Sequence, residues 1–135
     1  MDTEATRTLV KQFLAARSAG DLAGITAALA DDAVWVLPQS SSFGPFEGRD
    51  AVAKALGGGV SGTLFDPATI RRDIHKMVVE GDTAIVQQRL SATTLKGAEY
   101  VNEYCWVYTC RDGKIARLEE YADTLHAGRV FGTVS

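Results

Sequence analysis

Cysteine and histidine are scarce in this chain of 135 residues, which contains two of each. Cys105 and Cys110 are five residues apart on one predicted strand, so their side chains point to opposite faces of it. That arrangement suits neither a disulfide nor a metal site, and both cysteines are expected to be reduced packing residues. His75 and His126 stand apart from any Cys/His cluster. We therefore expect no metal site and no cofactor.

The chain also lacks an excess of positive charge and any long apolar run. It has 14 Lys and Arg against 17 Asp and Glu, a formal net charge of -3, and its basic residues are scattered. This pattern argues against a surface for nucleic acid or for an anionic membrane. No apolar run approaches the roughly 20 residues of a membrane span, and the stretch after Met1 lacks the features of a signal peptide. We expect a cytoplasmic protein that binds neither nucleic acid nor membrane.

Apolar residues are plentiful: they make up 46% of the chain, and its length suits one domain over residues 1–135 with a single core. The N-terminal part has helical spacing. An apolar stripe predicts a long helix over residues 2–20, which ends at Gly20. Two shorter helices are predicted over residues 22–30 and 49–56.

The rest of the chain is predicted to be β-structure. A short strand is predicted over residues 33–38, before the helix over residues 49–56. Four longer strands follow that helix, joined mainly by Asp-Gly or Gly-Asp turns, over residues 69–80, 84–94, 100–110 and 115–124. Helices followed by a run of antiparallel strands predict an α+β fold, with helices on one face of a curved sheet. Residues 57–67, which begin with three glycines, fit either a lid over a pocket or a plain loop.

Four stretches in a fixed order give the chain a family resemblance. SAGDLAGITAALADDAVW is followed by FEGRDAVAKAL, VVEGDTAIVQQR and DGKIARLEEYADT. Together they resemble the SnoaL-like members of the nuclear-transport-factor-2-like superfamily, which includes ketosteroid isomerases, polyketide cyclases and limonene epoxide hydrolases. The resemblance implies a conical α+β barrel, in which a curved, mostly antiparallel sheet wraps around a long N-terminal helix plus two shorter helices. It also implies a pocket for a small hydrophobic molecule and a homodimer formed through the sheet.

This fold supports many unrelated activities, so the catalytic residues of these relatives must be compared with the chain one position at a time. The oxyanion-hole tyrosine of ketosteroid isomerases corresponds to Phe13, which cannot donate a hydrogen bond. The position of their catalytic base corresponds to Leu37. The resemblance therefore excludes isomerisation by that pair of residues.

The catalytic set of limonene epoxide hydrolases is also mostly missing. Their water-holding Tyr and Asn correspond to Trp35 and Leu37, and their Arg-x-Asp pair corresponds to Gln87 and Arg89. Only their last acid has a counterpart, Glu120. Polyketide cyclases rely chiefly on one acidic residue on the final strand, and Glu120 again occupies that position. Of the three arrangements, the resemblance contradicts the cyclase-like one least.

Alternation divides the C-terminal hairpin into two faces, and composition alone leaves open which face is buried. The resemblance decides it by placing one set of side chains in the pocket. The expected lining residues are Phe13, Trp35, Gln87, Arg89, Asn102, Tyr104, Trp106, Leu118 and Glu120. The side chains expected on the outer face, where two copies of the chain would meet, are Glu103, Arg117, Glu119 and Asp123.

Apolar walls with a few directional polar groups are typical of a small-molecule site. Such walls would raise the pKa of Glu120 and suit it to general acid/base catalysis near neutral pH, while Arg89, Gln87, Asn102 and Tyr104 orient the substrate. Alternatively, Arg89 forms an ion pair with Glu120 and lowers the pKa of that carboxyl group instead.

The sequence thus favours a small enzyme of the isomerase, cyclase or hydratase type, acting on a small hydrophobic carbonyl or hydroxyl compound, with Glu120 and Arg89 as its catalytic residues. Two other functions stay open. The same pocket would serve a binding module that holds an apolar ligand without chemistry. The chain would also serve as a dimerising subunit that acts through its outer sheet.

Overall fold

A computed structural model describes residues 1–133 of the chain, and it begins with the long helix α1 (Thr3–Ala19). Asp2 caps this helix, because its side chain accepts a hydrogen bond of 2.7 Å from the backbone N–H of Ala5. Gly20 ends it in a left-handed conformation, with φ of 68°. The helix buries the stripe predicted for it, which includes Val10, Phe13 and Leu14.

Helix α2 (Leu22–Ala28) follows after a single turn and packs against α1. Asp21 caps it as predicted, accepting a hydrogen bond of 3.0 Å from the backbone N–H of Gly24. The two helices approach closely at Gly24, where an added Cβ would lie 2.9 Å from the Cβ of Ala16. The same Cβ would lie 2.5 Å from Oδ2 of the capping Asp21, so glycine is required there by the cap and by the contact between the helices, and not by its backbone conformation.

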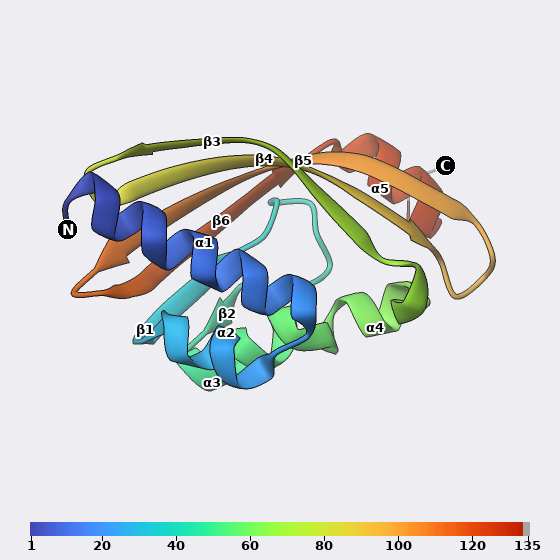
Figure 1. Ribbon diagram of the computed structural model, residues 1–135. Coiled ribbons are helices and arrows are strands. Elements are labelled where there is room, and N and C mark those ends of the chain that lie inside the picture. Colours follow the sequence, from blue (N-terminus) through green and yellow to red (C-terminus); the bar gives the residue numbers. More distant parts are fainter. Residues whose placement is uncertain (134–135) are drawn as a thin grey trace.

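The strands form one six-stranded sheet in the order β2-β1-β6-β5-β4-β3. Their bounds are β1 (Leu29–Val36), β2 (Phe46–Glu47), β3 (Arg71–Glu80), β4 (Thr83–Thr93), β5 (Glu99–Arg111) and β6 (Lys114–Ala122). Strands β1 and β6 run parallel, and the other neighbours run antiparallel. The curved sheet arches over α1 (Figure 1), so the predicted α+β class is confirmed. Because β2 and β3 are both edge strands, the sheet does not close into a complete barrel.

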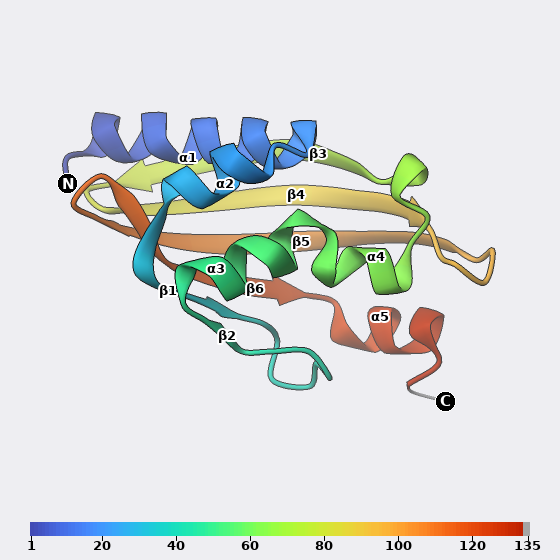
Figure 2. The ribbon, with the colours of Figure 1, turned by 90° about the horizontal axis from the view of Figure 1, so that it is seen from below.

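The helices of the middle segment lie on the same side of the sheet as α1 and α2 (Figure 2). Helix α3 (Arg49–Lys54) continues into the π-helical turn η1 (Ala55–Gly59), and α4 (Ser61–Leu64) and the 3₁₀ turn η2 (Pro67–Thr69) follow. The glycines leave helical geometry here, with φ of 114° at Gly58. Residues 57–67, expected as a lid or a plain loop, are therefore largely a kinked helical connection.

The C-terminal helix α5 (Thr124–Phe131) was not predicted. Strand β6 ends at Ala122, and the side chain of Asp123 accepts a hydrogen bond of 3.1 Å from the backbone N–H of His126. Asp123 thus caps a helix, and its predicted place on the outer face of the last strand is wrong. Helix α5 contacts β5 at one end of the sheet (Figure 2).

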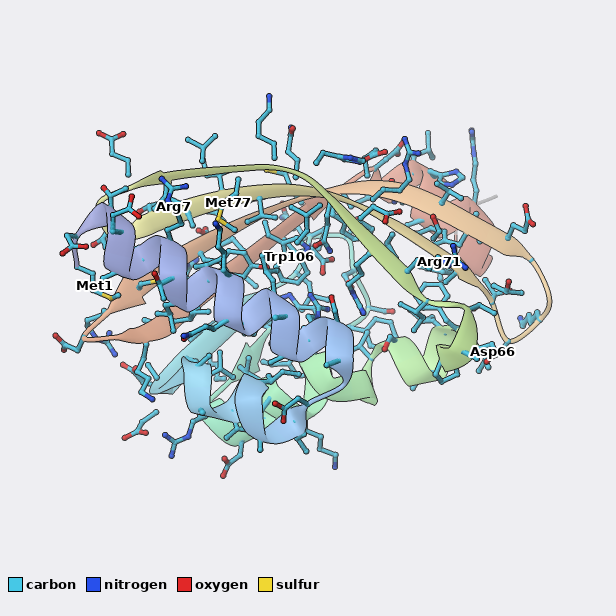
Figure 3. The ribbon with its side chains drawn as sticks, viewed as in Figure 1. Met1, Arg7, Asp66, Arg71, Met77 and Trp106 are labelled. Carbon is cyan, nitrogen blue, oxygen red and sulfur yellow. The ribbon has the colours of Figure 1, made fainter. Side chains whose placement is uncertain are left out.

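The main core lies between the helices and the inner face of the sheet. Trp106 points into this interior from β5, between the sheet and α1 (Figure 3), and is 2% exposed. A second, smaller apolar cluster at the other end of the sheet includes Phe65, Leu90 and Tyr100, and Phe131 of α5 packs against it. Helix α5 therefore closes an end of the structure that the predicted elements would have left open.

The outer face of the sheet carries exposed apolar side chains, among them Val78, Ile85, Val101 and Tyr121. The predicted homodimer through this face stays a prediction. Among residues 1–133, none of the helices combines the length and the apolar character that crossing a membrane requires.

The close approach at Gly24 predicts an unusual response to alanine. Alanine normally stabilises a helix interior by ~1 kcal/mol relative to glycine. Gly24→Ala should nevertheless lower the free energy of unfolding by about 1–3 kcal/mol, because the new methyl group overlaps the capping carboxylate of Asp21 and the Cβ of Ala16. Gly62→Ala is the matched control: that helical glycine has no atom within 4 Å of an added Cβ, so its free energy of unfolding should hold or rise. Urea unfolding measures both, and equal effects would contradict the close contact.

Candidate functional site

A cavity of about 360 Å³ lies between the inner face of the sheet and the helices. Side chains from α1, β1, the segment after β1, the α3–α4 segment, strands β3 to β6 and α5 form its wall. Most of the wall is apolar or aromatic. Its apolar and aromatic side chains include Trp35, Leu37, Phe43, Leu64, Phe65, Leu90, Tyr104, Trp106 and Phe131, and its larger polar ones are Arg17, Arg72, Gln88 and Glu120.

Strand β4 presents different residues to this cavity from those predicted. Gln88 and Leu90 are buried and line the wall, whereas Gln87 and Arg89 are exposed on the outer face. Arg89 forms an ion pair with Glu103, its cross-strand neighbour on β5, at 2.7 Å. The predicted placement of Gln87 and Arg89 in the pocket is therefore wrong. A shift of one residue moves every side chain of a strand to the opposite face.

Glu120 faces the cavity, as predicted. It lies opposite Trp106 in the β5–β6 pairing and is part of the cavity wall. Burial raises the pKa of the Glu120 carboxyl group to about 7, and the positive charge of Arg17 opposes that rise only partly. The alternative that Arg89 pairs with Glu120 and lowers its pKa is wrong, because Arg89 is bound to Glu103 on the other side of the sheet.

Arg17 is the main functional residue that the sequence analysis missed. It follows Val10, Phe13 and Leu14 on the buried stripe of α1, at the spacing of one helix face. Its guanidinium carbon lies 4.9 Å from the centroid of the Trp106 ring. Its Nε and Nη1 atoms are buried and have no hydrogen-bond partner within residues 1–133. Burial lowers the pKa of Arg17. Extending the apolar periodicity by one position would have placed this residue at the site.

A second arginine, Arg72, reaches the same cavity from the edge strand β3. It lies opposite Leu90, which is also part of the cavity wall. Burial lowers the pKa of Arg72 to about 9, and the like charge of Arg17 contributes to that shift. Two guanidinium groups and one carboxyl group therefore line this largely apolar cavity.

A chain of hydrogen bonds connects Asn102 to the cavity wall. The Asn102 amide donates to the hydroxyl of Tyr100 at 2.7 Å and to the backbone carbonyl of Asp123 at 3.0 Å. Its oxygen accepts a bond of 2.9 Å from the backbone N–H of Glu103. The Asn102 side chain is 5% exposed and lies outside the cavity wall, where its bonds hold Tyr100; its role in contacting substrate stays a prediction.

The hydrogen-bond chain ends at Tyr104. The hydroxyl oxygens of Tyr100 and Tyr104 are 2.7 Å apart. Either hydroxyl can donate in this bond, and when Tyr100 is the donor the Tyr104 hydrogen is available to a ligand in the cavity. Burial raises the pKa of Tyr104, so this phenol remains a neutral donor at neutral pH.

Of the remaining predicted residues, two line the cavity and two belong to the core. Trp35 and Trp106 form part of the wall with ring centroids 5.7 Å apart, and the Nε1 atom of each is buried without a partner among the described residues. Phe13 and Leu118 are fully buried core residues, and Phe13 packs edge-on against Tyr108 at 5.6 Å. Within residues 1–133, no group of three or more His, Cys, Asp or Glu side chains is arranged to hold a metal ion.

Known proteins resemble this chain in sequence pattern and in fold. A family model described as a SnoaL-like domain matches residues 10–118. A comparison with curated proteins finds no match. An NTF2-like protein of unknown function from Burkholderia pseudomallei is structurally similar, with a TM-score of 0.83 at 24% identity over 94% of this chain and 97% of that one.

Two further similar structures have functional descriptions. One is a putative SnoaL-like polyketide cyclase from Jannaschia sp., with a TM-score of 0.81 at 14% identity over 98% of this chain and 95% of that one. The other is an LEH-like epoxide hydrolase from M. tuberculosis, with a TM-score of 0.73 at 21% identity over 97% and 92% of the two chains. At these identities the likeness shows a common fold.

The raised pKa of Glu120 predicts how stability depends on pH. Between the unfolded glutamate pKa of about 4.3 and the folded value of about 7, the folded state keeps a proton that the unfolded state has released. Stability should therefore fall as pH rises through this window. We expect this group to remove roughly 3 kcal/mol of unfolding free energy between pH 4 and pH 8.

Glu120→Gln should abolish that loss, because an amide has no charge to bury. Urea unfolding of the wild type and the variant at pH 4, 6 and 8 measures the difference. The two proteins should diverge only above about pH 5, with the variant the more stable. A constant difference across the whole range would contradict a titrating carboxyl group at this position.

Proposed function

The chain belongs to the SnoaL-like domain family, and from this premise we propose that it is a small, cofactor-independent enzyme of general acid/base chemistry. Its reaction is of the isomerase, cyclase or hydratase type, on a small hydrophobic carbonyl or hydroxyl compound. The observation that carries this proposal is Glu120, a carboxyl group in an apolar cavity wall with its pKa raised to about 7 by burial. A group with that pKa both accepts and returns a proton near neutral pH.

The cavity also supplies groups suited to the charge that such a reaction creates. When Glu120 takes a proton from a carbon next to a carbonyl group, the electron pair of the broken C–H bond moves onto the carbonyl oxygen. The Tyr104 hydroxyl, held by Tyr100, and the guanidinium of Arg17 are donors for that oxygen. Returning the proton from Glu120 to a different carbon of the conjugated system completes an isomerisation. In a cyclisation the enolate carbon attacks an internal carbonyl carbon, the π electrons of that carbonyl move onto its oxygen, and Glu120 returns its proton to that oxygen.

The apolar part of the wall supports the choice of substrate. Trp35, Trp106 and Phe65 present flat apolar surfaces to the cavity, and Leu90 adds aliphatic surface. A volume of about 360 Å³ lies within the range of small-molecule sites. Apolar walls lower the local dielectric constant, which strengthens the interaction of Arg17 and Tyr104 with a developing negative charge.

The second candidate function is a binding module that holds such a compound without chemistry. It is favoured by one observation: within residues 1–133, no hydrogen bond fixes the Glu120 carboxyl group in the orientation that proton transfer needs. Ligand-dependent turnover separates the two functions.

Deuterium exchange at carbon tests the proposed chemistry. We expect the wild-type protein to accelerate exchange of the α-hydrogens of 2-tetralone or phenylpyruvate in D₂O, followed by proton NMR. Glu120→Gln should reduce the catalysed rate by at least ~100-fold, because it removes the base. Tyr104→Phe should reduce it by about 10–100-fold, because it removes one donor to the enolate oxygen. The pH–rate profile of the wild type should bend near pH 7, the pKa of Glu120.

Arg89→Gln is the matched control, because Arg89 carries a positive charge on the same sheet but on its outer face. That variant should retain the full rate. If the wild type and Glu120→Gln exchange both probes at the same rate while both bind them, the binding-module function replaces the catalytic one.

A further inference from the structure

We propose that this cavity selects a small organic anion, in which the oxygens of a carboxylate or an acidic enol lie between Arg17 and Arg72 and the hydrocarbon part lies against Trp35 and Trp106. The proposal rests on the proposed function for its location, because it names the substrate class of the same cavity. It concerns binding alone, so it can be tested without turnover.

Arg17 gives the first reason. Its Nε and Nη1 donors are buried, and no acceptor within residues 1–133 reaches them. A buried donor without a partner is unfavourable, and a buried charged donor is more so. The guanidinium lies against the Trp106 ring at 4.9 Å, a contact that stabilises the cation through the ring face but satisfies none of its N–H groups. An acceptor in the cavity would satisfy them.

Arg72 gives the second reason, because it adds another positive charge to the same wall. None of the ion pairs within residues 1–133 includes Arg17 or Arg72. The carboxyl group among the described residues of the wall is Glu120, which is largely protonated below pH 7. The cavity is therefore positively charged and apolar at once, and the repulsion between its two arginines is relieved by an anion placed between them.

The rest of the wall indicates an organic anion and not a small inorganic one. The two indoles have centroids 5.7 Å apart and leave their buried Nε1–H groups without partners among the described residues. A guanidinium group matches a pair of oxygens that lie in one plane, as in a carboxylate. A phosphate ion would satisfy the arginines but leave the aromatic faces uncovered, whereas an aromatic carboxylate meets both requirements.

Isothermal titration calorimetry of the full chain at pH 6 tests this with two probes of the same shape: 2-naphthoate, an anion, and 2-naphthamide, its neutral counterpart. We expect the wild type to bind the carboxylate at least ~10-fold more tightly than the amide. Arg72→Gln should weaken carboxylate binding by ~10-fold or more and leave amide binding within about twofold. Unchanged amide binding also shows that the variant is folded.

Arg71→Gln is the matched control. Arg71 is the neighbour of Arg72 on β3, is exposed, and lies outside the cavity wall. It changes the net charge of the protein by the same amount, so a loss that reflects overall charge would appear in both variants. Equal loss in both, or equal affinity of the wild type for the two probes, would overturn the proposal. The wild-type comparison alone decides the question if Arg72→Gln does not fold.

The pH dependence of wild-type binding provides an independent measurement. The titratable and charged groups near Glu120 are Arg17 on α1 and Tyr100, Tyr104 and Tyr108 on β5, and Arg72 on β3 lines the same cavity wall. Glu120 is the one that changes charge between pH 6 and pH 8, so 2-naphthoate affinity should fall over that range as the carboxylate forms. Glu120→Gln should flatten the dependence and keep the preference for the anion; 2-naphthamide affinity should show no such fall.

These outcomes separate the two proposals. An anion preference that needs Arg72, together with no Glu120-dependent exchange of either ketone, would support this inference and remove the catalytic function. Exchange that depends on Glu120, together with equal binding of 2-naphthoate and 2-naphthamide, would support the catalytic function and remove this inference.

Discussion

The contact between the guanidinium of Arg17 and the indole of Trp106 determines much of the site. It connects the end of α1 to the inner face of the sheet, and the positive charge of Arg17 acts on Glu120, which lies opposite Trp106 on β6. Arg17 and Glu120 form no ion pair within 4 Å. The cation therefore moderates the effect of burial on the acid without removing it, and the pKa of Glu120 stays at about 7.

A second constraint connects the cavity to the end of the sheet. Asn102 is bonded both to the backbone of Asp123, the cap of α5, and to Tyr100, whose hydroxyl is bonded to Tyr104. Tyr100 also packs against Phe65 and Phe131, with ring centroids at 5.4 and 4.9 Å. The same hydrogen-bond chain that reaches the cavity wall at Tyr104 thus anchors the helix that closes it. The polar side chains of this chain are tolerated in the interior because each of them forms at least one hydrogen bond.

The sequence predicted the fold class and the long first helix, because those depend on periodicity over many residues. The inward direction of Glu120 was predicted from the family resemblance, because both faces of the hairpin mix polar and apolar residues. The prediction of which side chains face the cavity failed where a shift of one residue along a strand changes the face. On β4 the resemblance placed Gln87 and Arg89 inward, although the more apolar alternate set, which includes Val86 and Leu90, would have indicated the other face. On β3 an irregularity in the pairing after Ile74 interrupts the alternation that would have identified Arg72. Helix α5 was missed because its cap, Asp123, directly follows a strand.

The strand order has a consequence for how the chain reaches this structure. Strand β6 is the last strand made, yet it lies in the interior of the sheet, between β1 and β5. Until its residues leave the ribosome, β1 has only the two-residue β2 beside it, and the edge of β5 that β6 will occupy is open. Pairing between distant parts of a chain is slow, and unpaired edges promote association between molecules. The strand that carries the acid is also the strand that joins the two parts of the sheet, so the cavity can acquire Glu120 only in the step that completes the sheet.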